Sequence, residues 1–279
     1  MAQITAADVG KLREMTNAGM MDCKKALSEA QGDLTAAVDI LRKKGVATTS
    51  ALGGREAKEG LISQYIAPGG KQGVLVEVNC QTDFVARNDV FRAFADEVAK
   101  KLAANPNVNL DADREAIVAQ FRENTKIARH AHMEVNGNGM IAAYIHTGGK
   151  VGVLVEVGAG KETTVAGDDF KQLVKDITLQ IAAGHPFCVS RDQVPADVIA
   201  KEKEIAAEQV KNKPPQAIAK IVEGKLEKFY QSYCLVDQGF VKKNEISVKE
   251  HINSVAKQLG DEVAIRRFVR FQVGEAASS

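Results

Sequence analysis

The strongest constraint on how this chain can fold is an internal duplication. Residues 60–78 align without a gap onto residues 139–157, and 13 of the 19 positions are identical. Each copy combines β-branched and other apolar residues with a central Gly-Gly, which predicts two strands joined by a tight turn. A chain with two such hairpins is expected to form two related subdomains, each with a small antiparallel sheet.

The duplication continues beyond the hairpins. Residues 126–135 resemble residues 264–273, so each half is predicted to close with a further strand. Between each hairpin and its closing strand, apolar residues recur at helical spacing. These helical patterns lie near residues 89–104, 112–124, 167–183 and 247–259. The fold class that follows is α+β, with two copies of hairpin, helix, helix and strand.

A separate module precedes the duplication. Residues 5–45 have apolar positions at helical spacing, which predicts three short helices around a small core. Breaks are expected at Asn17-Ala-Gly19 and at Gly32-Asp33. The predicted helix caps are Asp22, Asp33 and Gly45. Residues 46–59 lose the periodicity and are expected to form a linker, with room for a helical stretch.

An insertion interrupts the second half. Pro195 and Lys213-Pro-Pro215 mark the start and the turn of a predicted helical hairpin. Its apolar residues form a seam flanked by Lys and Glu, as in a coiled coil. The seam consists of Ile205, Val210, Ile218, Ile221, Val222, Leu226 and Phe229. The hairpin is a candidate contact surface, either for a second copy of the chain or for a partner.

Together these features predict four parts. They are a three-helix module with its linker at 1–55, a core subdomain at 56–138, a second core subdomain at 139–188 and 236–279, and the inserted hairpin at 189–235.

Composition excludes several classes of protein. Lys and Arg total 37 against 36 Asp and Glu, so there is no basic field that would favour a nucleic-acid partner. No apolar run approaches the length of a membrane span, and the N-terminus has no features of a secretory signal or transit peptide. We therefore expect a soluble, cytoplasmic protein. The cysteines, Cys23, Cys80, Cys188 and Cys234, form no CxxC pair, which favours buried or incidental thiols in a reducing compartment over a disulfide framework or a zinc site.

Two longer motifs point to a family. Residues 79–88 read Asn-Cys-Gln-Thr-Asp-Phe-Val-Ala-Arg-Asn, and residues 17–26 read Asn-Ala-Gly-Met-Met-Asp-Cys-Lys-Lys-Ala. Both resemble signatures of the elongation factor Ts family. The members of that family are nucleotide-exchange factors for the GTPase elongation factor Tu. The resemblance implies a factor that acts by binding, not an enzyme, and one that needs no cofactor or metal of its own. It also implies that the N-terminal module is similar to a ubiquitin-associated domain.

The resemblance further implies three sets of partner-binding residues. The segment Thr82, Asp83, Phe84 and Val85 would enter elongation factor Tu near its magnesium ion, with Phe84 acting as a wedge. Arg13, Met20 and Met21 would contact the GTPase domain of that partner, and His146 would face another of its domains. Some relatives continue into a further C-terminal helix that touches the partner; the sequence here ends at Ser279, so that contact is expected to be absent.

The same residues have simpler alternatives. Thr82 or Asp83 is a natural cap for the next helix, and Phe84 would then pack inward like other aromatic residues at the start of an amphipathic helix. One of Met20 and Met21 would close the three-helix core, although two flexible thioethers in a loop suit an adaptable binding surface. His146 is equally compatible with an ordinary turn.

Enzymatic alternatives find little support. His130 and His132 share one face of a predicted strand, but no third metal ligand lies at a recognisable spacing. The segment at residues 158–163 resembles a phosphate-binding loop, but Val155 stands where the first Gly is required and Glu162 stands where Ser or Thr is required. The runner-up functions are a hydrolase that depends on Cys80 or on a metal, and an adaptor whose residues 1–45 bind the target alone. The sequence does not settle the oligomeric state; a homodimer and a heterotetramer with elongation factor Tu are the alternatives.

Overall fold

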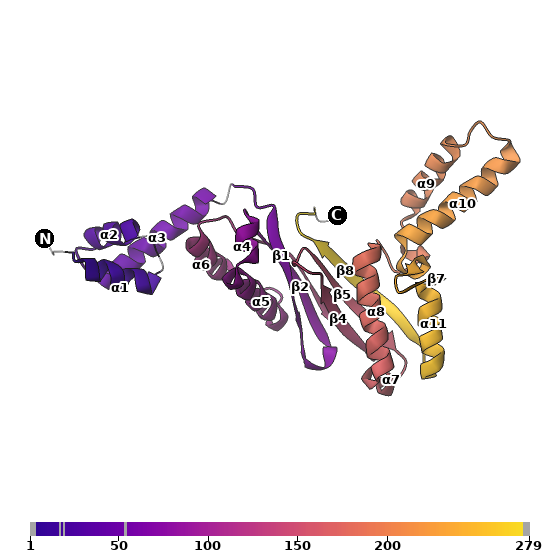
Figure 1. The fold of residues 1–279 in the computed structure, drawn as a ribbon, viewed down its shortest axis with the longest axis horizontal. Coiled ribbons are helices and arrows are strands. Elements are labelled where there is room, and N and C mark those ends of the chain that lie inside the picture. The colour runs from indigo at the N-terminus through magenta and orange to yellow at the C-terminus, as the bar shows by residue number, and fades with distance from the viewer. Residues whose placement is uncertain (1–3, 17, 19, 53–54, 276–279) are drawn as a thin grey trace. The chain divides into compact units, whose positions relative to one another are not determined.

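The computed structural model describes residues 4–16, 18, 20–52 and 55–275, with side chains for all of these except residues 44–52 and 215–216. Helices alternate with small sheets (Figure 1), which confirms the α+β prediction. The chain divides into two compact units. The first unit contains Met1–Ser63, Val76–His130 and Val273–Ser279, and the second contains Gln64–Leu75 and Ala131–Gln272. In the described part of the chain, every helix is too short or too polar to cross a membrane.

The N-terminal module of the first unit consists of three helices, as the spacing predicts. They are α1 (Ala6–Thr16), α2 (Met20–Glu29) and α3 (Leu34–Leu52). Their small core contains Leu12, Cys23, Ala26, Leu27 and Ala37. Asp33 caps α3, because its Oδ1 accepts hydrogen bonds from the backbone N–H groups of Thr35 (2.7 Å) and Ala36 (3.0 Å).

Two boundaries of this module differ from the prediction. Asp22 lies in the first turn of α2 and is not its N-cap, because the helix already begins at Met20. Gly45 does not end α3, which continues to Leu52; glycine within a helix costs only about 1 kcal/mol relative to Ala, so it does not stop a helix by itself. The predicted break at Asn17 and Gly19 lies outside the described residues.

The first copy of the duplicated pattern has the predicted order of elements. It contains β1 (Glu59–Ile66), β2 (Gln72–Cys80), α4 (Asp83–Arg87), α5 (Asp89–Ala104), α6 (Asp111–Phe121) and β3 (Lys126–Glu134), with a 3-10 turn, η1, at Pro68–Gly70. The three strands form one sheet in the order β1-β2-β3. Helix α6 ends at Phe121 because Arg122 adopts the left-handed conformation, with φ of 56°. The sequence did not separate the short helix α4 from α5.

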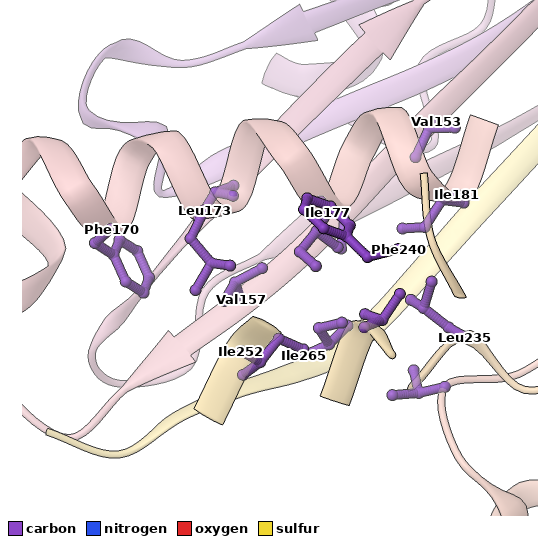
Figure 2. Packing of buried hydrophobic residues seen from close by; sticks show 14 of the residues in the cluster. Val153, Val157, Phe170, Leu173, Ile177, Ile181, Leu235, Phe240, Ile252 and Ile265 are labelled. Atoms are coloured by element: carbon purple, nitrogen blue, oxygen red, sulfur yellow. The ribbon is translucent and has the colours of Figure 1, made fainter. Parts of the chain in front are cut away.

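The second copy repeats this arrangement in the second unit. It contains β4 (Gly139–Ile145), β5 (Val151–Ala159), α7 (Glu162–Ala166), α8 (Asp168–Gly184), α11 (Val248–Leu259) and β8 (Val263–Gln272). The antiparallel sheet has the order β4-β5-β8. Helix α8 turns one apolar face, with Phe170, Leu173 and Ile177, toward the core (Figure 2). Val153 and Val157 of β5 belong to the same buried cluster.

The insertion forms a pair of helices, α9 (Ala196–Glu208) and α10 (Pro215–Tyr233), which pack against each other (Figure 1). Pro195 precedes α9 and Pro215 begins α10, as predicted. The predicted seam is partly wrong: Val210 lies beyond the end of α9, and Ile205 is 40% exposed, whereas Ala206 is buried. The sequence also missed the short strands β6 (Gly239–Phe240) and β7 (Lys243–Ser247), and the 3-10 turns η2 (Arg191–Gln193) and η3 (Leu235–Asp237).

The duplication is preserved in the buried charges. In the first copy, the guanidinium of Arg129 donates to the buried carboxylate of Glu77 over 2.7 Å. In the second copy, Arg267 donates to the buried Glu156 over 2.8 Å. Glu77 and Glu156 occupy equivalent positions in the aligned hairpins, as Arg129 and Arg267 do in the aligned closing strands. A buried carboxylate requires such a charged partner. Both copies therefore retain the same pair of a buried glutamate and an arginine.

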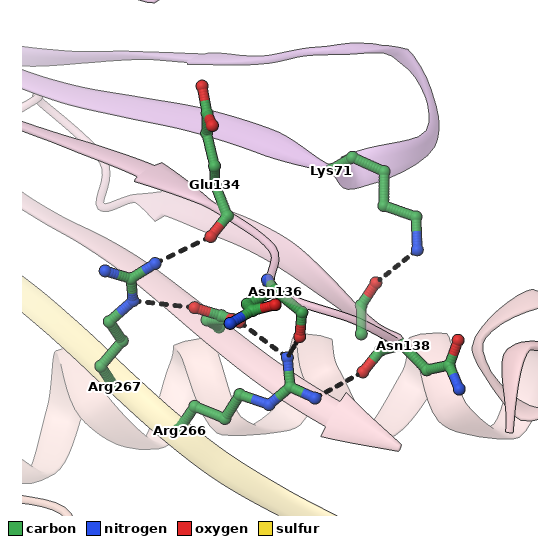
Figure 3. Close-up of polar contacts among 8 residues, drawn as sticks. Lys71, Glu134, Asn136, Asn138, Arg266 and Arg267 are labelled. Carbon is green, nitrogen blue, oxygen red and sulfur yellow. Dashed lines mark hydrogen bonds and ion pairs between the residues drawn. The ribbon is translucent and has the colours of Figure 1, made fainter. Parts of the chain in front are cut away.

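Each buried carboxylate also binds backbone from the other copy. The N–H of Gly274, just after β8, donates to Glu77 over 2.9 Å. The N–H of Asn136, just after β3, donates to Glu156 over 3.5 Å. Around Glu156, Arg266 also donates to the carbonyls of Asn136 and Asn138, and Arg267 donates to the carbonyl of Glu134 (Figure 3). The copies thus exchange the segments that follow their closing strands.

Candidate partner-binding surface

A sharp turn between β2 and α4 presents the segment from Thr82 to Val85. Thr82 has extended backbone and caps α4, since its hydroxyl accepts a hydrogen bond from the N–H of Val85 over 3.4 Å. The thiol of Cys80 donates to the carbonyl of Thr82 over 3.1 Å. Asp83 pairs with Arg87 one helical turn later, over 3.1 Å. The prediction that Thr82 or Asp83 caps a helix is therefore confirmed for Thr82.

The two apolar residues of this segment point in opposite directions. Val85 is 8% exposed and contributes to the core, whereas Phe84 is 82% exposed. The alternative in which Phe84 packs inward is therefore wrong for this structure. Apolar side chains are normally buried, and a large aromatic group held in solvent by a capped turn has the properties of a contact residue.

Glu123 fixes this turn from outside the motif. Its carboxylate accepts three hydrogen bonds: from the N–H of Gln81 (3.1 Å), from the N–H of Thr82 (3.0 Å) and from the hydroxyl of Thr82 (2.6 Å). Glu123 follows the left-handed residue that ends α6, so its place beside the turn depends on tertiary structure. Sequence reasoning missed this residue because no local pattern connects positions that are 41 apart.

The N-terminal module presents a second exposed apolar group. Met20 is 59% exposed and Met21 is 65% exposed, so neither closes the three-helix core. The Arg13 guanidinium, also exposed, approaches the sulfur of Met20 over 4.0 Å. Met15, which the sequence analysis did not select, is 60% exposed on the same helix as Arg13. Flexible thioethers beside a cation suit a surface that adapts to a partner.

An ion pair connects these two groups of residues within the first unit. Arg122 donates to the carboxylate of Asp22 over 2.6 Å. Asp22 directly follows Met21, and Arg122 directly precedes Glu123, which holds the turn at Thr82. Helix α3 also packs against α6. We call Arg13, Met15, Met20 and Met21 the methionine surface. The structure therefore places this surface and the turn that carries Phe84 in one compact unit.

His146 belongs to the second unit. It is exposed at the turn between β4 and β5, where its N–H donates to the carbonyl of Val151 over 2.9 Å. Its Nδ1 lies 3.0 Å from the hydroxyl of Tyr144. Its role as a turn residue is thus clear in the structure, and its exposed ring is also available to a partner.

The residues of the enzymatic alternatives do not form a site. Cys80 is fully buried, so a substrate cannot reach its thiol. His130 is exposed, and His132 hydrogen-bonds Gln72 over 2.9 Å. Residues 158 and 159 lie in β5, ahead of α7. Within the described ranges, His, Cys, Asp and Glu side chains nowhere form a group of three or more that could hold a metal ion.

Comparison with known proteins gives one consistent result. Residues 81–275 match the family model described as "Elongation factor TS". The elongation factor Ts of Nostoc sp. is 42% identical over 293 aligned residues, which cover 99% of this chain and 94% of that protein. The protein of the same name from Clostridium botulinum is 41% identical, with 98% and 93% covered, and that from Nautilia profundicola is 43% identical, with 99% and 94% covered.

Proposed function

Because this chain belongs to the elongation factor Ts family and is therefore a translation elongation factor, we propose that it is the nucleotide-exchange factor for elongation factor Tu. It would bind the GDP-bound form of that GTPase and promote the release of GDP. The observation that carries this proposal is the exposed Phe84 on a turn held by Thr82 and Glu123.

Exchange of this kind requires no covalent chemistry. The factor and the nucleotide bind the same GTPase with negative coupling, so each weakens the other by the same factor. Every tenfold loss of nucleotide affinity requires about 1.4 kcal/mol of differential contact. Interactions that exist only when the nucleotide site is distorted can supply this free energy.

Phe84 supplies only a part of the required free energy. Complete burial of a Phe side chain contributes about 1.5–3 kcal/mol, which corresponds to roughly one to two decades of affinity. In our proposal the wedge disturbs the site of the partner's magnesium ion, whose charge neutralises the nucleotide phosphates. Thr82, Asp83 and Val85 complete the segment that reaches this site.

The remaining free energy would come from contacts spread over the chain. Arg13, Met20 and Met21 would bind the GTPase domain, and the exposed Met15 extends that surface. His146 would contact another domain of the partner. The four-part division of the chain, the likeness to a ubiquitin-associated domain, the coiled-coil character of the inserted hairpin, the oligomeric state and the cytoplasmic location stay predictions.

The test is the release of fluorescent GDP from elongation factor Tu, followed with and without this protein. We expect substoichiometric amounts to accelerate release. The acceleration should be smaller when excess magnesium is added, because added magnesium opposes the proposed disturbance. Release at the spontaneous rate, with saturating factor, would contradict the proposal.

A further inference from the structure

Two of the four cysteines meet at the root of the inserted hairpin. The Sγ atoms of Cys188 and Cys234 lie 3.6 Å apart, although 46 positions separate the residues. Their backbones form a parallel β-bridge. Neighbouring extended segments lie about 4.7–4.9 Å apart, which is within the range of roughly 4.4–6.8 Å that Cα atoms span in disulfides. All four cysteines are free thiols, but the sequence did not predict that two of them lie side by side.

The backbone around the two thiols is held in register on both sides. The N–H of Phe187 donates to the carbonyl of Tyr233 over 2.9 Å. The N–H of Leu235 donates to the carbonyl of Cys188 over 2.9 Å, and the N–H of Val236 donates to the carbonyl of Val189 over 3.0 Å. The rings of Phe187 and Tyr233 stack with centroids 4.6 Å apart. The sulfurs thus need to approach by only about 1.5 Å to reach bonding distance.

An ion-pair cluster fixes the same root. Arg191 donates to both carboxylate oxygens of Glu227 on α10, each over 2.9 Å, and to Asp237. The Arg191 guanidinium also lies 4.6 Å from the centroid of the Tyr230 ring. The segments that carry the two cysteines are therefore preorganised in the reduced protein.

We propose that Cys188 and Cys234 are a redox-sensitive pair that forms a reversible disulfide across the root of the hairpin by exchange with a small-molecule disulfide. The thiolate of Cys188 attacks one sulfur of the small molecule and expels one thiol. The thiolate of Cys234 then attacks the sulfur of Cys188 and expels the second thiol. In total two protein thiols are oxidised, and one small-molecule disulfide is reduced to two thiols.

The environment sets the order of these steps. Cys188 is partly exposed, whereas Cys234 is fully buried, so the external reagent meets Cys188 first. Burial raises the pKa of the Cys188 thiol above its ordinary value and raises that of Cys234 to about 12. Since the thiolate is the attacking form, oxidation should be slow at neutral pH and accelerate about tenfold per pH unit at mildly alkaline pH.

The experiment incubates the full-length protein in glutathione redox buffers, quenches with acid, and counts free thiols after alkylation. We expect the four thiols to fall to two, with a mass loss of two hydrogen atoms and a peptide that links Cys188 to Cys234. The oxidised form should also resist proteolytic cleavage around residues 189–235 more than the reduced form. Four free thiols in the most oxidising glutathione buffer would overturn the proposal. A disulfide that involves Cys23 or Cys80 would also overturn it.

Single variants test the two steps separately. Cys234→Ser should accumulate a glutathione adduct on Cys188, because the resolving thiol is missing. Cys188→Ser should form neither the adduct nor the disulfide. Cys23→Ser is the matched control, since it removes a buried thiol elsewhere and should leave the linkage intact. A stable adduct in the wild-type protein would show that Cys234 does not resolve it, and would also overturn the proposal.

Discussion

Phe84 has an unusual position for an aromatic side chain in a folded protein, with 82% of its surface exposed. If the proposed function holds, Phe84→Ala should strongly slow the release of GDP from elongation factor Tu and leave the free energy of unfolding nearly unchanged. The physical reason is that removal of an exposed ring leaves no cavity. Fluorescent GDP release measures the first effect, and denaturant unfolding measures the second.

Val85→Ala provides the matched control for this prediction, because the adjacent side chain is only 8% exposed. It should reduce the free energy of unfolding while the exposed ring of Phe84 stays in place. If Phe84→Ala instead lost about 3–5 kcal/mol of stability, as is typical of a buried Phe, the aromatic ring would be a core residue and not a contact residue.

Glu123 tests whether the turn must be rigid. We predict that Glu123→Ala slows exchange even though Phe84 is intact, because the N–H groups of Gln81 and Thr82 lose their acceptor. Each unsatisfied group costs about 1–3 kcal/mol, so the turn should rearrange. Glu123→Gln retains an oxygen acceptor and should be intermediate in the same assay. Equal exchange rates for all three proteins would show that Glu123 does not position Phe84.

At the scale of elements, helices α1–α3 have their own small core. We predict that deletion of residues 1–55 leaves a remainder that still unfolds cooperatively and catalyses exchange at high concentration. The concentration for half-maximal exchange should rise, because Arg13, Met20 and Met21 are removed. A titration of GDP release, together with gel filtration, measures both effects.

Arg122→Ala tests whether the effect of deleting residues 1–55 comes from the loss of the methionines or from the loss of an ion pair. The deletion also removes Asp22, the ion-pair partner of Arg122, and the neighbour of α6. If Arg122→Ala alone reproduced the deletion, the ion pair would be the important contact and the methionines would not. Full activity of the deleted protein at low concentration would exclude the whole methionine surface.

Elements differ in how far local sequence determines them. The hairpins around residues 60–78 and 139–157 were predictable because strand alternation and the Gly-Gly turn are local signals. Helix α4 was not resolved from α5, because its five residues are too few to show a helical period. The exposure of Ile205 followed from packing between α9 and α10, which spacing alone does not determine.

The candidate site divides in the same way. Its motif residues, from Thr82 to Val85, were found from the sequence, and so was the cap at Thr82. Glu123 and the contact between Cys188 and Cys234 were missed, because both depend on chain segments that only the tertiary fold brings together.

At the scale of the whole molecule, the two copies each bury one glutamate, paired with an arginine, in the central strand of their sheet. For Glu156, burial acts to raise the pKa, but the hydrogen bonds from Arg266 and Arg267 prevail and hold it below the ordinary value of 4.5. A lowered pKa in the folded state stabilises the protein above the unfolded pKa. This contribution is lost as the pH falls through the folded value.

We therefore predict that Glu156→Gln destabilises the protein most at neutral pH, and that the difference from wild type shrinks below about pH 4. Denaturant unfolding at a series of pH values measures this difference. Glu262→Gln, at an exposed position next to β8, is the control and should show little difference at any pH. A constant destabilisation from neutral to acid pH would mean that the loss is one of packing and not of charge.

The segment that follows each closing strand binds the buried glutamate of the other copy. This arrangement affects the order in which the protein can fold during synthesis. A ribosome delivers the first copy of the duplicated pattern well before the second, and N-terminal domains generally fold first during synthesis. Here, however, one of the hydrogen bonds to the buried Glu77 comes from Gly274, which lies 197 positions later in the chain. The first sheet can acquire its strands early, but the hydrogen bonds to its central carboxylate are completed only after the second copy has been synthesised.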